Sequence, residues 1–207
     1  MSGDRIRVPP TKSTLIQLKH QVGFLEDGYA LLERKRDLLT RLVYERIREY
    51  RRLRAEAHAS LKTAYRNLSL AQMRMGSRAL QQAGLGAARA LELRILPRRN
   101  LGVEFPAVKA ERRPLQPVGL MGTDGSFDAA RDHLADTAVR LARLGEAETA
   151  LTRLLAEQRK AQKRVNALKY NIIPRYRRTI RFIQSSLEEE ERNTLFQIKV
   201  LREEGRV

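Results

Sequence analysis

The first part of the sequence carries apolar side chains at alternating intervals of three and four residues. This spacing places them on one face of an α-helix. No proline interrupts the pattern between Pro10 and about Gln82, so we predict one helix of roughly 70 residues, about 105 Å long at 1.5 Å per residue. The predicted core positions of this helix are Leu15, Leu18, Val22, Leu25, Leu61 and Leu68. A helix of this length needs an equally long partner, because a globular domain of this size cannot bury it.

A second stretch, from Ser126 to the C-terminus, repeats apolar residues at a spacing near 3.5. Its predicted core positions are Val165, Leu168, Ile172, Ile183 and Leu187, and the same pattern includes Leu134, Leu141, Glu148 and Leu195. Two helices of matching length that are joined within one chain pack antiparallel. The predicted fold class is therefore all-α, a long antiparallel two-helix coiled coil that brings both termini to one end.

Local signals refine the ends of these two helices. Thr11, Ser13 and Thr14 are candidate N-caps of the first helix, and Thr14 with Gln17 fits a capping box. Ser126 is the expected N-cap of the second, with Asp128 in its first turn. Pro174 lies deep inside the second helix, where it removes one backbone hydrogen bond, and we expect a bend there rather than a break.

The middle of the chain follows a different pattern. Leu91, Leu93 and Ile95 alternate with charged residues, and Leu101, Val103 and Phe105 alternate with Gly102 and Glu104. This alternation predicts a β-hairpin with a four-residue turn at 97–100. Residues 106–125 are rich in proline and glycine and are predicted to be loop. The predicted organisation is a helix in 1–82, a small hairpin and loop in 83–125, and a helix in 126–207.

Composition supports long helices and excludes several kinds of chemistry. Aromatic residues make up only 5% of the chain, there is no Trp, and charged residues make up 31%. The absence of cysteine excludes disulfides, thiolate metal sites and cysteine nucleophiles. No secretory signal and no apolar run of about 18 residues is present, so a cytoplasmic protein that does not insert into the membrane is expected.

The candidate catalytic and metal-binding residues have simpler explanations. His20, His58 and His133 are far apart and lack a second ligand at metal spacing. The acidic run from Glu188 to Glu191 points in all directions on a helix and cannot converge on a cation. No phosphate-binding glycine loop or nucleophile–base constellation is present. We therefore predict no catalytic residues, no cofactor and no metal, and a chain that is not itself an enzyme.

The formal net charge of +17 indicates an acidic partner. Charge alone favours nucleic acid, with an anionic membrane surface or an acidic protein cavity as the other candidates. Part of the positive charge forms a predicted basic belt, whose members are Lys163, Arg164, Arg177, Arg178 and Arg181.

Particular blocks of sequence point to one family. The C-terminal half contains 164–168, then 172–174 with Pro174, then 179–184, and then the acidic run that precedes Arg192. These blocks resemble the C-terminal signature of the D subunits of V-type and archaeal-type ATPases. The stretch after Pro10 is similar to the N-terminal signature of the same family, and the similarity covers nearly the whole chain in the expected order.

This resemblance implies a rotor. In that family the chain is an axle whose paired terminal helices enter a head of alternating A and B subunits. The other end binds the small F subunit and a funnel-shaped protein, the C or d subunit, at the membrane ring. The resemblance thus implies a non-catalytic torque shaft at the cytoplasmic, peripheral side of the membrane. The residues expected to centre its tip in the head are Leu15, Leu18, Phe196, Ile198 and Leu201.

Three other classes of protein compete with this interpretation. A basic coiled coil that binds nucleic acid through phosphates accounts for the charge and predicts steep salt dependence. An F-type gamma shaft performs the same role but carries a larger α/β domain in its middle. A cytoskeletal or scaffold coiled coil has longer uninterrupted heptads and no middle hairpin. The C-terminal blocks favour the rotor shaft of a V-type or archaeal-type ATPase over all three.

Overall fold

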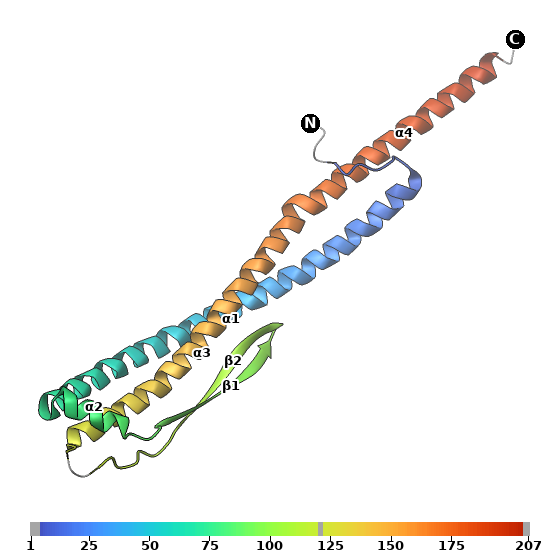
Figure 1. Ribbon diagram of the computed structural model, residues 1–207. Helices are drawn as coiled ribbons and strands as arrows, with labels where there is room; N and C mark the ends of the chain where they lie inside the picture. The colour runs from blue at the N-terminus through green and yellow to red at the C-terminus, as the bar shows by residue number, and fades with distance from the viewer. Residues whose placement is uncertain (1–4, 120–121, 205–207) are drawn as a thin grey trace. The chain divides into compact units, whose positions relative to one another are not determined.

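The computed structural model describes residues 5–119 and 122–204. The elements in chain order are α1 (Lys12–Met75), α2 (Ser77–Leu85), β1 (Leu91–Asn100), β2 (Val103–Arg112), α3 (Gly125–Ala167), a π-helical segment η1 (Leu168–Ile172) and α4 (Ile173–Glu204). Figure 1 shows these helices and strands along the chain. The chain forms two compact units. The first unit combines the residues up to Leu38 with those from Gln158 onward, and the second spans Leu39–Glu157.

In the first unit, the start of α1 packs antiparallel to the end of α3 and to α4. Lys12 forms an ion pair with Glu191, whereas Glu26, further along α1, pairs with Arg177, which lies nearer the start of α4. From Lys12 to Glu26 the residue number rises along α1, while the partner number on α4 falls from 191 to 177. The two helices therefore run antiparallel. The predicted core residues Leu18, Val22, Val165 and Ile183 are buried. Five further predicted core residues of this unit, Leu15, Leu25, Leu168, Ile172 and Leu187, are half-buried.

In the second unit, the remainder of α1 packs antiparallel to α3. The hydroxyls of Ser60 on α1 and Thr137 on α3 lie 2.7 Å apart. Further along α1, Arg74 pairs with Asp124, which lies before the start of α3. The first-helix positions predicted here, Leu61 and Leu68, are half-buried. The fully buried positions of α1 in this region are mostly alanines, at Ala57, Ala64 and Ala71. Small side chains let two helices approach closely, which buries their neighbours on the same face.

The predicted face of the second helix is wrong in its first half. Leu134 and Leu141 are 36% and 43% exposed, and Glu148 is also exposed. The side chains that pack against α1 belong to neighbouring positions, and the buried residues of this stretch are Phe127, Ala130, Ala135, Thr137, Ala147, Ala150 and Leu154. The spacing of apolar residues in the sequence predicts that the large leucines form the interface with α1. The structure places alanine and threonine there instead, because small side chains permit the two helices to approach closely.

Of the predicted N-caps, Thr11 is confirmed, whereas the capping box at Thr14 and the cap at Ser126 are wrong. Helix α1 begins at Lys12, and the Thr14 backbone N–H donates to the Thr11 hydroxyl at 3.2 Å, so Thr11 is the cap. Helix α3 begins at Gly125, and Asp124 precedes it. The Ser126 hydroxyl donates a hydrogen bond to the Asp124 carboxylate at 2.9 Å. Asp128 lies in the first turn, as predicted.

Helix α1 ends earlier than the sequence suggested. It stops at Met75, and Gly76 adopts φ 78 and ψ 154 before the short helix α2 begins at Ser77. A φ in this range is rare for residues with a Cβ and is favourable only for glycine. The predicted continuous helix to Gln82 is therefore interrupted at Gly76.

The predicted β-hairpin is present, but its turn lies elsewhere. The strands β1 and β2 pair antiparallel from Leu91 opposite Arg112 to Asn100 opposite Val103. The turn consists of Leu101 at φ 50 and Gly102 at φ 79, two positive values that are typical of a type I′ hairpin turn. Pro97, predicted as a turn residue, lies within β1, opposite Pro106. Residues 106–112, predicted as loop, are the second half of β2.

Helical structure continues through Pro174, directly after the π-helical segment. The Ile173 backbone N–H donates to the Leu168 carbonyl, five residues back. Pro174 has no N–H to donate, and its ring crowds the preceding turn of an α-helix. A widened turn immediately before the proline gives the ring room. The bend expected at Pro174 stays a prediction.

Candidate interaction surfaces

The end of α4 extends beyond the start of α1. Figure 1 shows this overhang. Lys12 begins α1, and its ammonium group lies 2.7 Å from the Glu191 carboxylate. From Arg192 to Glu203 every side chain is exposed except Val200, which is half-buried. Four of these exposed side chains are large and apolar, namely Leu195, Phe196, Ile198 and Leu201. We call residues 192–203 the single-helix tip.

The apolar residues of the single-helix tip point to more than one side. Successive residues of a helix are rotated by about 100°. Phe196 therefore lies about 100° from Leu195, whereas Leu201 lies about 120° from Leu195 on the opposite side. Polar and charged side chains, among them Lys199 and Arg202, lie between them. The apolar residues of the tip therefore do not form a single stripe.

The N-terminal segment before α1 folds back along α4. The Ile6 backbone N–H donates to the buried Thr179 hydroxyl at 3.0 Å, and the Arg5 guanidinium lies 4.3 Å from the centre of the Phe182 ring. This strap covers α4 ahead of the single-helix tip. Of the five residues predicted to form the tip, Leu18 is buried and Leu15 half-buried inside the helix pair, whereas Phe196, Ile198 and Leu201 are exposed.

All five members of the predicted basic belt have exposed side chains. Among the described residues, two members of the belt, Arg177 and Arg178, form polar contacts with their own chain. Arg177 binds Glu26 at 2.7 Å, and the Arg178 guanidinium donates to the Pro174 carbonyl at 3.3 Å. Lys163 and Arg164 lie on α3, on the other side of the π-helical segment from the three α4 arginines.

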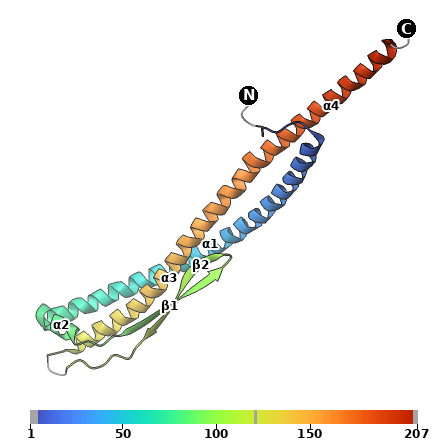
Figure 2. The same cartoon turned by 45° about the vertical axis from the view of Figure 1, so that its right-hand side comes forward.

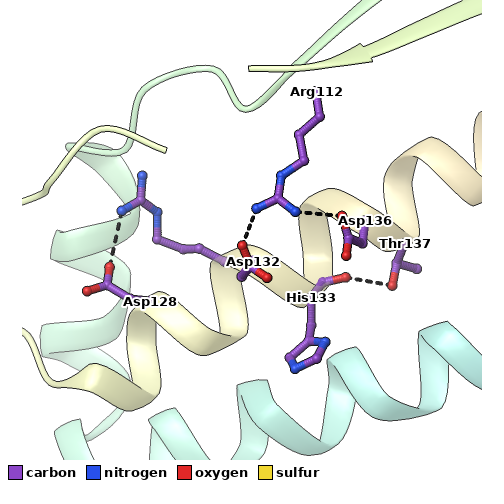
Figure 3. A network of polar contacts seen from close by, with 7 residues as sticks. Arg112, Asp128, Asp132, His133, Asp136 and Thr137 are labelled. Atoms are coloured by element: carbon purple, nitrogen blue, oxygen red, sulfur yellow. Dashed lines mark hydrogen bonds and ion pairs between the residues drawn. The ribbon is translucent and has the colours of Figure 1, made fainter. Parts of the chain in front are cut away.

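The hairpin is attached to α3 by charged groups. Figure 3 shows the Arg112 guanidinium, at the end of β2, between the carboxylates of Asp132 and Asp136 on α3, and the contact to Asp136 is 2.6 Å. Two hydrogen bonds raise the pKa of Arg112 above its usual value, and the bond to Asp132 has a larger effect than the bond to Asp136. Figure 2 shows the two strands alongside α3. Phe105 and Val103, near the turn, are buried.

Sequence reasoning missed these anchors. Asp132 and Asp136 are four residues apart, which places them on one face of α3, and that spacing was the available signal. A second anchor, Glu146, accepts the Val108 backbone N–H at 3.1 Å, and no sequence pattern identifies it. Among the described residues, no group of three or more potential metal ligands comes together. No helix in the described part of the chain is long and apolar enough to span a membrane.

The fold and its surfaces first define the class of protein. It is an antiparallel helical hairpin with a small β-hairpin inserted between its helices, and it has exposed surfaces for partners. The model of the ATP synthase D-subunit family matches residues 14–203, so the chain belongs to that family. It is 35% identical over 197 residues to the D subunit of the V-type ATP synthase of Thermotoga neapolitana, with 95% of this chain and 97% of the relative covered.

Archaeal relatives give the same result. The D subunit of the A-type ATP synthase of Methanosphaera stadtmanae is 34% identical over 199 residues, with 94% of this chain and 93% of the relative covered. That of Pyrococcus furiosus is 32% identical over 201 residues, with 95% and 94% covered. The family assignment leaves the nucleic-acid-binding coiled coil without support beyond the net charge.

Proposed function

We propose that this chain is the central-stalk rotor shaft of a V/A-type ATP synthase. It transmits torque between a catalytic head of A and B subunits and the ion-translocating ring in the membrane, and it catalyses no reaction itself. It acts at the cytoplasmic face, peripheral to the membrane. Its other partners are the F subunit and the funnel-shaped C or d subunit.

The observation that carries this proposal is the single-helix tip. A shaft that turns inside a head needs an end that enters a cavity and is surrounded by it. Phe196 and Leu201, each 67% exposed, are costly to leave in water and are distributed around the helix. Enclosure by a ring of head subunits removes both from solvent, whereas a one-sided docking groove covers only one of them.

The helix pair behind the tip supports the transmission of torque. Ile183 and Val165 are almost fully buried, and the strap bonds to Thr179 on the same face of α4. Interlocked side chains resist rotation of one helix about the other because repacking them opens voids. Torque applied at the tip is therefore passed along both helices.

Rotation also requires contacts that exchange easily. The exposed basic belt suits this role because ion pairs at a protein surface contribute only about 0–1 kcal/mol each. An asymmetric shaft makes different contacts with each catalytic pair of the head and so biases these pairs toward different conformations. Nucleotide steps then turn the shaft, or rotation of the shaft drives the nucleotide steps.

The proposal is tested by purifying the tagged chain from solubilised native membranes, with a nuclease treatment and a moderate-salt wash. We expect A, B and F subunits in rotor stoichiometry by mass spectrometry. Recovery of nucleic acid or ribosomal proteins without ATPase subunits contradicts the proposal and assigns the +17 charge to nucleic acid.

A further inference from the structure

The two edges of the β-hairpin can be told apart by the direction of their backbone groups. In an antiparallel pair, residues alternate between pointing N–H and C=O at the partner strand and pointing them away. Arg113 N–H donates to the Ala90 carbonyl at 2.9 Å, so the even-numbered residues of β1 point inward. Pro97 and Pro106, which lack an N–H, face each other at an outward-pointing position, as this alternation requires. Leu91, Leu93 and Ile95 therefore direct their backbone groups to the free edge of β1.

The free edge of β2 is closed by α3. The outward N–H of Val108 donates to Glu146 at 3.1 Å, and the outward carbonyl of Glu104 accepts from the Arg153 guanidinium at 2.8 Å. Between them lies Pro106, which has no N–H. Side chains of α3 thus bind two of the outward-pointing groups of this edge. Covering an edge strand with a helix is a common way to prevent it from pairing.

The free edge of β1 has no such cover. Within the described residues, the outward N–H groups of Leu93 and Ile95 have no hydrogen-bond partner, and their side chains are 49% and 66% exposed. Pro97 interrupts the edge on one side. What remains is a short apolar edge, Leu91–Ile95, with backbone donors and acceptors ready for another strand.

We propose that the Leu91–Ile95 edge pairs with a short extended segment of another stalk protein, which carries acidic residues next to its apolar ones. This proposal rests on the proposed function. Strand addition supplies the backbone hydrogen bonds that the edge lacks, and alternate apolar side chains of the added strand cover Leu93 and Ile95. The protein then has both hairpin edges closed, β2 by its own helix and β1 by the partner.

Charge identifies the chemistry of the segment. Arg98 and Arg99 are exposed directly beyond Pro97, and within the described residues neither has an acidic partner. Acidic side chains that flank the added strand would meet them. A second copy of this chain is disfavoured as the occupant, because two chains of formal charge +17 repel each other.

Hydrogen–deuterium exchange tests the pairing, with the full-length chain measured alone and within the purified ATP synthase complex. We expect the Leu93 and Ile95 amides to exchange at least tenfold more slowly in the complex. The inward-pointing Leu96 amide serves as the internal control and is protected in both samples. Equal exchange of Leu93 and Ile95 in the two samples overturns the proposal, although a complex that still contains the chain leaves the proposed function intact. A dimer of the isolated chain in sedimentation, with Leu93 protected, assigns the edge to a second copy and also overturns it.

A matched pair of variants separates strand pairing from simple burial. Leu93→Pro removes one outward N–H and leaves the bonds between β1 and β2 in place, whereas Leu93→Thr keeps the N–H. We expect the Ile95 amide to lose its protection in complexes that carry Leu93→Pro and to keep it with Leu93→Thr. Protection of the inward-pointing Leu96 amide shows that the hairpin is folded in both. If Ile95 stays protected with Leu93→Pro, the edge is buried without strand pairing and the proposal is wrong.

Discussion

Side chains of the same type occupy very different environments on α4. Ile183 is fully buried, whereas Ile198 is 56% exposed. Large aliphatic residues at helical spacing are informative in the sequence, and Leu18 and Ile183, both predicted as core, are buried. Ala147 and Thr137 could not be found in this way, because hydrophobicity scales rank leucine above small residues, whereas a close helix contact selects small ones.

These two isoleucines provide a direct test of the packing. Replacing Ile183 by alanine removes buried methyl groups and leaves a cavity, so we expect a loss of about 2–5 kcal/mol in the free energy of unfolding. The same change at Ile198 is expected to cost less than about 0.5 kcal/mol in the isolated chain. Urea denaturation followed by circular dichroism measures both. Equal destabilisation by the two changes would contradict the assigned helix interface.

Leu101 is a strained residue in the hairpin turn. It is the only non-glycine residue with positive φ in the described part of the chain, at φ 50, and a left-handed conformation costs a residue with a Cβ about 1–2 kcal/mol. Asparagine tolerates this conformation and is preferred before glycine in a type I′ turn. We expect Leu101→Asn to raise the free energy of unfolding of the hairpin by roughly 1 kcal/mol. Slower exchange of the hairpin amides reports the gain, and faster exchange would show that the Leu101 side chain matters more than its backbone.

At the scale of elements, the two long helices and the existence of the hairpin could be predicted, but the details of their ends could not. Pro97 and Pro106 each favour a turn in the sequence, yet they face each other at a position that needs no N–H from either strand. Only the register of the pair shows that both prolines are harmless there. The sequence offered Thr11, Ser13 and Thr14 as N-caps of the first helix, and the hydrogen bond from the Thr14 N–H to Thr11 selects Thr11.

The start of α3 depends on an ionised Asp124. Two hydrogen bonds hold the pKa of Asp124 below its usual value. The bond from Ser126 has the larger effect, and the bond from Arg74 follows it in size. A depressed pKa means that the ionised carboxylate stabilises the folded state above the pKa of the unfolded chain, and this stabilisation is lost as pH falls through the lower folded value. Carbon-13 NMR titration of the Asp124 carboxyl measures this pKa. We expect Ser126→Ala to raise it toward the ordinary value, and an unchanged titration in that variant would show that the hydroxyl is not the main cause.

At the scale of the whole molecule, the net charge gave a misleading first indication. Charge alone favoured nucleic acid, whereas the order of the C-terminal blocks pointed to the ATP synthase D-subunit family, which the match over residues 14–203 confirms. The anchors of the hairpin and its open β1 edge could not be predicted, because they depend on which strand lies against α3. Pairing of this kind is a property of the folded chain.

The single-helix tip is expected to be required for assembly with the head but not for folding. Replacing Phe196 and Leu201 by aspartate puts charge where an apolar cavity is proposed. Each apolar side chain buried there contributes about 1.5–3 kcal/mol, so we expect at least a tenfold weaker association with purified head subunits. The thermal midpoint of the isolated chain should not change, because both residues are exposed.

The matched control for this change is the pair Asn193→Ala and Gln197→Ala, which alters polar positions of the same tip. It is expected to leave association within about twofold of the unaltered chain, which is within about 0.5 kcal/mol. Equal loss in the two pairs would show that the tip is not held by its apolar residues.

Rotation is the most direct measurement of the central claim. The chain contains no cysteine, so His58→Cys at an exposed position of α1 provides a unique attachment point for a visible probe. The head is fixed to a surface, ATP is added, and single complexes are followed under the microscope. The rotor account predicts that the probe turns in one direction in ATP-dependent steps. A probe that stays fixed relative to the head while the same complexes hydrolyse ATP would contradict it.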